Sequence, residues 1–414
     1  MKIGFYLNNT GHDLIDFSHP ENGNPGIRGT EYMIWEIACG LGVEFAEVYL
    51  FAPYPASMPA TVTAVKCGDE LDALEKAKRL DVDIMVLRSL ENQKEVFRAI
   101  DRCGVKCVMW SHNLETVALA DAMADCRYVR RNVCVSRQQY ERLRDHPVFE
   151  KSTYIYNALV FSSIPREVPR AVDKKNVVTY IGTLEAYKGF HALAHVWPEI
   201  KKKVPDAVLY VLDSEDRGRL IAAGDDARLT EYEKDIRRSL SDERGELLPG
   251  VTFEGCQRGS VKEATIMKTK VGVANPGGVE EFCVTAVEFE AYGVPVVAKR
   301  SFGLLETVCD RKTGILIKNE RQLADAVVRL LCDDGLCDVM GTQGSQYVRE
   351  HFDMPLIIED WKKVLTEVYE DLPVKPDYRC TYPFFNYKWL RELSRLWKKT
   401  PFGRNSPSVM KYEK

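Results

Sequence analysis

The sequence lacks the patterns that mark several large classes of protein. None of its 414 residues belong to an apolar run of about 18 residues, the length that a transmembrane helix needs. No Walker loop and no G-x-S-x-G motif occurs, so neither a P-loop nucleotidase nor a hydrolase with a nucleophile elbow is indicated. Lysine and arginine number 57 against 61 acidic residues. Because positive charge is not in excess, we expect no nucleic-acid partner.

Metal-binding patterns are also missing. The 12 cysteines form no C-x2-C pair and no zinc spacing. His191 and His195 are four residues apart, but no third ligand is suggested, so we expect no metal site. Scattered thiols within apolar runs are typical of a reducing compartment. Residues 1–7 predict a first strand rather than a signal peptide, and we therefore expect a cytoplasmic protein.

The chain does contain a regular alternation of short apolar runs and longer amphipathic stretches. Such alternation predicts parallel sheets that are covered by helices on both faces. The expected strands of the first half are residues 2–7, 47–51, 83–87, 105–110 and 133–135. Those of the second half are residues 177–181, 208–212, 251–253, 271–274, 294–298 and 314–317.

The alternation pauses at residues 164–176, where Pro165, Pro169 and mixed charges predict a linker. We therefore expect an α/β fold of two doubly wound, Rossmann-like domains. Ligands of such sheets bind outside the carboxyl ends of the strands, and two facing edges would form one cleft. The expected divisions are a first Rossmann-like domain at 1–165, a second at 175–353, and crossover helices with a basic tail at 354–414.

The most informative segment is residues 275–288, which follows an expected strand and opens a helix. Its paired glycines allow the backbone to turn sharply and to approach a ligand. The N–H groups of Val284 and Thr285 at the helix start suit a phosphate. The carboxylates of Glu280 and Glu288 can accept hydrogen bonds from vicinal hydroxyls of a sugar or a ribose. The segment therefore predicts a site for a nucleotide sugar.

The ordered motifs from Pro276 to Ile317 resemble the nucleotide-sugar site of the retaining GT-B glycosyltransferases of family 4, also called glycosyl transferases group 1. They include Glu280-x7-Glu288, with Glu281 as a competing carboxylate, and Gly293-x-Pro295-Val296-Val297. The strings Gly-Leu-Leu-Glu at 303–306 and Gly-Ile-Leu at 314–316 are similar to that family as well.

A second similar segment lies upstream, at Tyr-Ile-Gly-Thr-Leu-Glu-Ala-Tyr-Lys-Gly, residues 180–189. The resemblance implies that Lys188 is a cation on the donor diphosphate, where negative charge develops. The family usually has an arginine where this chain has Thr183, so one cation is missing, and Arg28 and Arg300 are candidates to replace it. This chain also has Glu281 and Cys283 at two positions where the family prefers glycine.

The first half holds two further similar segments. Residues 25–31, which contain Gly29 and Thr30, resemble the family's glycine loop near the donor phosphate and the acceptor. The segment Trp110-Ser111-His112-Asn113 is similar to the family's histidine segment near the reacting sugar. The resemblance therefore implicates His112 in orienting that sugar.

The resemblance implies a hexosyltransferase that retains the anomeric configuration, with a UDP- or GDP-linked sugar as substrate and no cofactor. Glu288 would hold the ribose, Glu280 the sugar hydroxyls, and Lys188 the diphosphate. The acceptor would be a glycan or a lipid-linked or protein-linked molecule. The expected catalytic residues are His112, Lys188 and Glu280. The expected donor-binding residues are Gly29, Thr30, Gly182, Thr183, Lys188, Glu280, Phe282, Cys283, Val284, Thr285 and Glu288.

Two alternative functions stay open. Because Thr183 replaces an arginine, the chain is also compatible with a degenerate, non-catalytic module that binds a sugar nucleotide. A sugar-nucleotide epimerase on the same fold would need extra acid–base carboxylates, which the sequence does not identify.

The tail from residue 384 onward holds eight Lys or Arg and two Glu, together with Phe384, Phe385, Trp389 and Trp397. Residues 384–399 predict an amphipathic helix. One interpretation is peripheral contact with an anionic inner membrane surface. The other, which we favour, is a helix that packs back on the first domain with its basic face in water.

Overall fold

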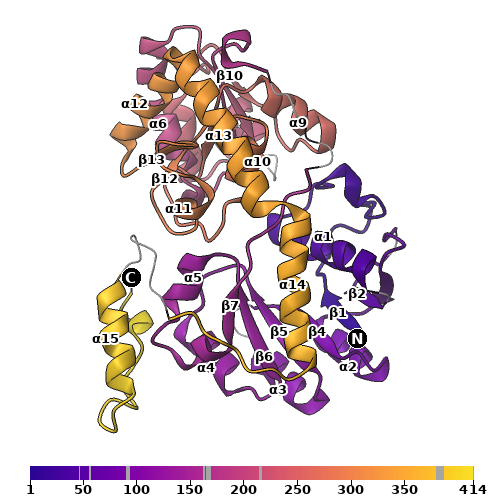
Figure 1. Ribbon diagram of the computed structural model, residues 1–414. Coiled ribbons are helices and arrows are strands. Elements are labelled where there is room, and N and C mark those ends of the chain that lie inside the picture. The colour runs from indigo at the N-terminus through magenta and orange to yellow at the C-terminus, as the bar shows by residue number, and fades with distance from the viewer. Residues whose placement is uncertain are drawn as a thin grey trace. The chain divides into compact units, whose positions relative to one another are not determined.

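The computed structural model describes residues 1–45, 47–55, 57–89, 94–161, 164, 169–213, 217–378 and 387–413 (Figure 1). The chain forms two compact units. The first unit comprises Met1–Pro20, Gly29–Ala158 and Met354–Lys414, and the second comprises Glu21–Arg28 and Leu159–Asp353. Each unit contains one sheet in which the paired strands are parallel.

The sheet of the first unit has the strand order β3-β2-β1-β4-β5-β6-β7. Its strands are β1 (Ile3–Tyr6), β2 (Val48–Ala52), β3 (Thr63–Lys66), β4 (Ile84–Arg88), β5 (Lys106–Ser111), β6 (Val129–Cys134) and β7 (Ser152–Tyr154). The sequence did not predict β3 and β7, and it placed the start of β6 four residues late. The two missed strands are short edge strands, and β3 is mostly exposed, so neither has the apolar run that marks a buried strand.

The sheet of the second unit has the order β10-β9-β8-β11-β12-β13. Its strands are β8 (Val177–Ile181), β9 (Val208–Leu212), β10 (Val251–Phe253), β11 (Val271–Ala274), β12 (Val296–Lys299) and β13 (Gly314–Ile317). All but β12 have the bounds expected from the sequence. Strands that are buried on both faces appear in the sequence as short continuous apolar runs, which explains the agreement.

Helices cover both sheets. Those of the first unit are α1 (Gly29–Glu44), α2 (Glu70–Arg79), α3 (Lys94–Cys103), α4 (Val117–Asp125), α5 (Arg137–Arg142), α14 (Met354–Tyr369) and α15 (Lys388–Lys398). Those of the second unit are α6 (Phe190–Lys203), α7 (Arg217–Ala223), α8 (Glu231–Ser239), α9 (Gly259–Lys268), α10 (Val284–Ala291), α11 (Leu304–Thr307), α12 (Glu320–Cys332) and α13 (Asp334–Phe352). Short 3-10 helices occur at Pro20–Asn22, Pro147–Lys151, Ala171–Asp173, Ala186–Lys188 and Val409–Tyr412.

Helix α14 returns the chain to the first unit. Its Trp361 is fully buried and meets Trp110 of β5 edge to face, with ring centroids 4.7 Å apart. Phe5 of β1 lies 6.4 Å from the same ring. This aromatic cluster joins α14 to the centre of the first sheet. None of the helices in the described ranges combines the length and the hydropathy that a bilayer crossing needs.

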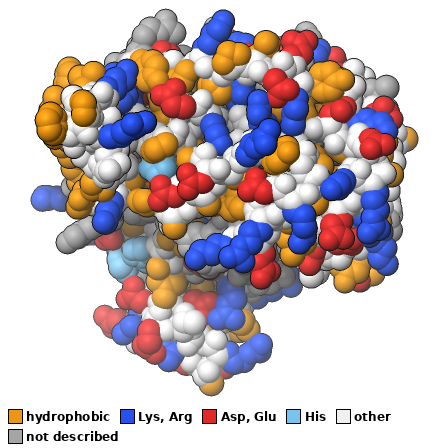
Figure 2. Space-filling model, turned by 90° about the horizontal axis from the view of Figure 1, so that it is seen from below, with side chains coloured by type: hydrophobic (Ala, Val, Ile, Leu, Met, Phe, Trp, Pro, Cys, Tyr) orange, Lys and Arg blue, Asp and Glu red, His pale blue; other side chains and the backbone are white. Residues whose placement is uncertain are grey.

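The C-terminal helix differs from its prediction in extent and orientation. Helix α15 spans Lys388–Lys398, while Phe384 and Phe385 lie outside the described residues, as does Pro165 of the predicted linker. The helix packs on the first unit, but the expectation that its basic face lies in water is wrong. Arg391 is fully buried, whereas Trp389 is 75% exposed. Elsewhere on the face seen in Figure 2, basic and acidic side chains intermingle.

Candidate functional site

Strand order places the candidate site of the second unit at a topological switch point. Strands β9 and β10 follow on one side of β8, whereas β12 and β13 follow on the other side of β11. In open parallel sheets a crevice forms outside the carboxyl ends of two central strands at which the order reverses in this way. The segment 182–188 follows β8, and the segment 275–283 follows β11. These are the two segments that the sequence singled out, and the fold brings them together.

The centre of the site is an ion pair between Lys188 and Glu280. The Lys188 Nζ donates to Glu280 Oε2 at 2.6 Å, and the Asn275 Nδ2 donates to the same oxygen at 2.9 Å. Burial alone would lower the pKa of Lys188, but the charge of Glu280 and the hydrogen bond to it outweigh burial and raise the pKa. Lys188 is therefore a fixed cation. It pairs with Glu280 rather than with Glu281, and Asn275 is a supporting residue that the sequence argument did not single out.

Glycines allow the two loops to pack closely. Gly189 has a φ of 72°, in the left-handed region that favours glycine. A Cβ atom on Gly278 would overlap the carbonyl oxygen of Tyr187, and one on Gly277 would lie 2.9 Å from the Gly189 Cα. The paired glycines therefore let one protein loop approach another, in addition to any role near a ligand. The Ser301 Oγ also donates to the Gly278 carbonyl at 2.8 Å, which fixes the loop from its far side.

Helix α10 begins beside this pair without a capping side chain. Cys283 occupies the N-cap with a φ of 35°, and its side chain makes no capping hydrogen bond. Burial raises the pKa of its thiol to about 12, so the N-cap is uncharged. The first turn contains no acidic residue, and Val284 and Thr285 are half-buried. An uncapped helix start offers N–H groups to an anion.

Phe282, which the sequence placed among the donor-binding residues, is buried. Its ring meets that of Phe352 edge to face, with ring centroids 5.1 Å apart.

A second lysine–glutamate pair lies one turn into α10. The Lys262 Nζ of α9 donates to Glu288 Oε1 at 2.6 Å, and the two side chains are 17% and 14% exposed. The sequence predicted Glu288 but not Lys262, because nothing in a pattern of single residues connects positions on different helices. The second unit therefore presents two carboxylates on either side of a helix start, each held by a lysine.

The remaining expected donor-binding residues of this unit lie after β8. The Gly182 N–H donates to the Leu212 carbonyl at 3.0 Å, and the Thr183 hydroxyl lies 3.4 Å from Glu185 Oε2. Of the two candidates for the missing cation, Arg300 donates to Asp310 Oδ2 at 2.8 Å, whereas Arg28 is exposed at the end of the 21–28 segment. Replacement of the missing cation by either arginine stays a prediction.

The first unit contributes a separate polar cluster at the carboxyl end of β5. His112 is 8% exposed and stacks at a tilt on Trp110, with ring centroids 4.5 Å apart. Burial and, to a lesser degree, the charge of Arg88 lower the pKa of His112 to about 3. His112 is therefore a neutral imidazole whose buried Nε2 makes no hydrogen bond to the described residues.

Helix α1 follows β1 of the same sheet, in which β4 lies between β1 and β5. Gly29 and Thr30 form its first residues, and a Cβ atom on Gly29 would have no heavy atom within 4 Å. The Arg88 Nη1 at the end of β4 donates to Glu31 Oε1 at 3.1 Å. The sequence argument did not single out this pair. Within the described ranges, no group of three or more His, Cys, Asp or Glu side chains is arranged to hold a metal ion.

Comparison with known proteins gives this geometry a family context. Residues 163–347 match the family described as glycosyl transferases group 1. A D-inositol 3-phosphate glycosyltransferase of Corynebacterium urealyticum is 29% identical over 203 residues, which make up 49% of this chain and 44% of that protein. The chain thus spans less than half the length of this curated relative.

Solved structures extend the likeness to the whole fold. The Anabaena protein Alr3699/HepE, crystallised with UDP and glucose, has a TM-score of 0.64 at 15% identity and covers 89% of this chain and 100% of its own. Sucrose-phosphate synthase of Thermosynechococcus elongatus has a TM-score of 0.65 at 15% identity, with coverages of 90% and 100%. The expectation of two Rossmann-like units of the GT-B type is confirmed by this likeness.

Proposed function

We propose that this chain, whose residues 163–347 match the glycosyl transferases group 1 family, transfers a sugar from a nucleoside-diphosphate donor to an acceptor hydroxyl. The observation that carries the proposal is the Lys188–Glu280 pair at the β8/β11 switch point, next to the uncapped start of α10. A cation and an anion-binding helix start together suit a diphosphate, and a carboxylate beside them suits sugar hydroxyls.

Lys188 stabilises the leaving diphosphate in this proposal. An ammonium group has three N–H donors, and the bond to Glu280 uses one of them. The pair can therefore stay intact while Lys188 also donates to a phosphate oxygen. Negative charge grows on that oxygen as the bond to the sugar breaks, so a fixed cation lowers the barrier more than it strengthens ground-state binding.

Glu280 and Glu288 hold the two ends of the donor. Glu280 is oriented by Lys188 and Asn275 and accepts hydrogen bonds from the sugar, whereas Glu288 accepts them from the ribose. His112, which is neutral because its pKa is low, orients the reacting sugar through a hydrogen bond rather than by donating charge. No step in this scheme requires a metal ion.

The transfer proceeds with retention, and a hexose is the sugar that we expect. The bond between the anomeric carbon and the diphosphate oxygen breaks, and a bond from that carbon to the acceptor oxygen forms on the same face. The departing diphosphate takes the proton of the acceptor hydroxyl, so no side chain acts as a general base. The family match supports retention, and the UDP complex of the Anabaena structure favours UDP as the first nucleotide to test.

The first experiment is a thermal-shift screen against UDP, GDP, ADP and their common sugars. A ligand that binds only the folded state raises the melting temperature by mass action. We expect one nucleotide to stabilise the wild type and Glu288→Ala to lose that shift, with release of the free nucleotide on incubation with the matching sugar donor and acceptor. Binding without turnover of any donor would assign the chain to the non-catalytic module, and no shift at millimolar concentration would refute the proposed site.

A further inference from the structure

The C-terminal helix α15 exposes its apolar face instead of burying it. The exposed fractions of Trp389, Leu393 and Trp397 are 75%, 64% and 51%, and Leu390 and Leu396 are about half exposed. Positions 389, 390, 393, 396 and 397 follow the spacing of one helix face. Figure 2, which shows the molecule from below, has hydrophobic side chains gathered at its left edge, the side on which α15 lies in Figure 1.

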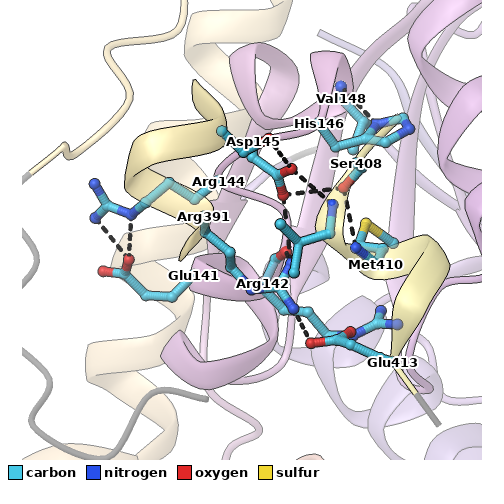
Figure 3. A network of polar contacts seen from close by, with 12 residues as sticks. Glu141, Arg142, Arg144, Asp145, His146, Val148, Arg391, Ser408, Met410 and Glu413 are labelled. Atoms are coloured by element: carbon cyan, nitrogen blue, oxygen red, sulfur yellow. Dashed lines mark hydrogen bonds and ion pairs between the residues drawn. The ribbon is translucent and has the colours of Figure 1, made fainter. Parts of the chain in front are cut away.

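The opposite, polar face of α15 and the residues that follow it are held on the first unit by a polar network centred on Asp145 (Figure 3). Asp145 is 3% exposed and accepts hydrogen bonds from the Ser408 Oγ at 2.9 Å and the Val409 N–H at 2.8 Å. The Ser394 Oγ donates to it at 2.9 Å. Arg391 and Lys398 complete the anchor, each at 3.4 Å from an Asp145 oxygen. Because the polar face is fixed in this way, the outward orientation of the apolar face is part of the fold.

Both described acidic residues of the tail are neutralised by arginine. Glu392 pairs with Arg395 and Arg144, and Glu413 pairs with Arg142 and Arg391. The exposed charged residues in 387–413 are Lys399, Arg404 and Lys411, all of them basic. Phe402, which is 87% exposed, lies between the first two in the sequence. The outward surface of the tail is therefore apolar and aromatic with a positively charged border.

We propose that this surface, formed by α15 and residues 399–412, docks the protein on an anionic lipid bilayer. An amphipathic helix with Trp and Leu on its outer face and basic residues beside it matches the chemistry of a membrane–water interface. Within residues 387–413 every exposed charged residue is basic, whereas a surface for a protein partner would carry both signs, so we infer anionic lipid as the occupant. The inference is independent of the proposed function, because its test uses no donor sugar.

The tryptophans supply a direct readout. Of the six in the chain, Trp35, Trp110, Trp197 and Trp361 are fully buried, so only Trp389 and Trp397 are open to solvent. Lipids brominated on their acyl chains should quench these two on binding, and vesicles should protect them from iodide. The experiment mixes the full chain with vesicles of phosphatidylcholine, alone or with about a third phosphatidylglycerol, and measures cosedimentation and quenching at low and physiological salt.

We expect binding to the anionic vesicles only, weakening as salt increases. Trp389→Ser with Trp397→Ser should abolish it, and Lys399→Glu with Arg404→Glu should weaken it roughly tenfold or more, since each basic residue contributes about a fivefold factor. Leu14→Ser is the matched apolar control, because Leu14 is 95% exposed elsewhere in the first unit. Arg79→Glu with Lys202→Glu is the charge control, and both controls should bind like the wild type.

Three results would overturn the proposal. The first is no binding to anionic vesicles, and the second is equal loss in the control variants. The third is self-association in sedimentation velocity that the double tryptophan variant abolishes while vesicle binding stays absent, which would assign the face to a second copy of the chain. Thermal unfolding of each variant verifies that the fold is intact.

Discussion

The carboxyl edges of the two sheets are built on different principles. In the second unit, two lysine–glutamate pairs lie at the edge with N–O distances of 2.6 Å, and their side chains are between 14% and 25% exposed. In the first unit, Ser111, His112 and Glu115 at the end of β5 are at most 8% exposed. The second edge is charged and partly open, whereas the end of β5 in the first sheet is buried and joined by hydrogen bonds, with the Arg88–Glu31 ion pair at the end of β4 beside it.

This difference indicates a division of labour. A partly exposed ion pair can take on a further charged partner, because its groups keep some contact with water and their desolvation is incomplete. A buried cluster cannot, and serves instead to hold neutral groups in position. In the cluster at the end of β5, the Ser111 Oγ donates to Asn132 Oδ1 at 2.7 Å, and burial raises the pKa of Glu115. We therefore expect ligand charge at the second edge and orientation at the first.

Lys188→Met should have the largest effect. Loss of a group that stabilises charge in the transition state costs about a hundredfold to a thousandfold in turnover. We expect a decrease of that size in kcat, with a smaller change in donor affinity, measured by release of free nucleotide. If instead kcat is unchanged and kcat/KM falls only because KM rises, Lys188 binds the donor but does not stabilise the transition state.

The matched control for this variant is Lys299→Met. Lys299 ends β12 on the same sheet edge, but its Nζ donates to the Lys318 carbonyl at 2.8 Å and makes no pair with Glu280. It should keep nearly full activity. The double variant Lys188→Met with Glu280→Gln removes both charges, so no carboxylate is left without its lysine. It therefore separates the loss of stability from the loss of catalysis. If the double variant recovers the turnover of the wild type, Lys188 has no role beyond neutralising Glu280.

Glu288→Gln should have the next largest effect, on donor binding rather than on kcat. A hydrogen bond to a charged group contributes about 1.5 to 3 kcal/mol, so the donor Kd should rise about tenfold to a hundredfold. Lys262→Met should have a milder effect, roughly threefold, because it removes only the orientation of Glu288. Titration by calorimetry measures both values, and tighter binding in Lys262→Met would instead mean that the lysine competes with the ligand.

His112→Gln tests the neutral edge, with about a tenfold loss of turnover if one orienting hydrogen bond is removed. Since the folded pKa is about 3, His112 itself should add no inflection near pH 6.5 to the kcat/KM profile. As the pH falls from 6.5 toward about 3, His112 binds a proton in the unfolded state but not in the folded state. His112 therefore lowers the free energy of unfolding by about 1.4 kcal/mol for each unit by which the pH falls.

Urea unfolding of the wild type and of His112→Gln at pH 7, 6 and 5 measures this contribution. We expect the variant to lose less stability than the wild type as the pH falls. Parallel loss in both proteins would show that His112 is protonated in the folded state.

The sequence predicted the second unit better than the first, for a physical reason. Strands such as β11 are short apolar runs buried on both faces, and the Glu280 and Glu288 motif lies within one continuous segment. The edge strand β3 has no such run. Lys262 reaches Glu288 only because the fold brings α9 beside α10. The orientation of α15 depends on Asp145, about 250 positions earlier in the chain. Amphipathic spacing identifies the two faces of a helix, but not which of them the protein buries.

Among the variants of residues expected to touch the donor, Thr183→Arg should have the smallest effect, and it tests the charged edge by adding a charge to it. The family resemblance leads us to expect an arginine at position 183, where the Thr183 hydroxyl lies 3.4 Å from Glu185 Oε2. A partly exposed arginine near a diphosphate contributes about 0.2 to 1 kcal/mol, so the donor Kd should fall no more than about fivefold. Thr183→Lys should gain less, because a guanidinium can bind phosphate with two parallel bonds. The gain should shrink at high salt, and Thr183→Ala should show none. If all three variants bind the donor like the wild type, position 183 does not face the diphosphate, and the charge of this edge comes from Lys188 and the start of α10.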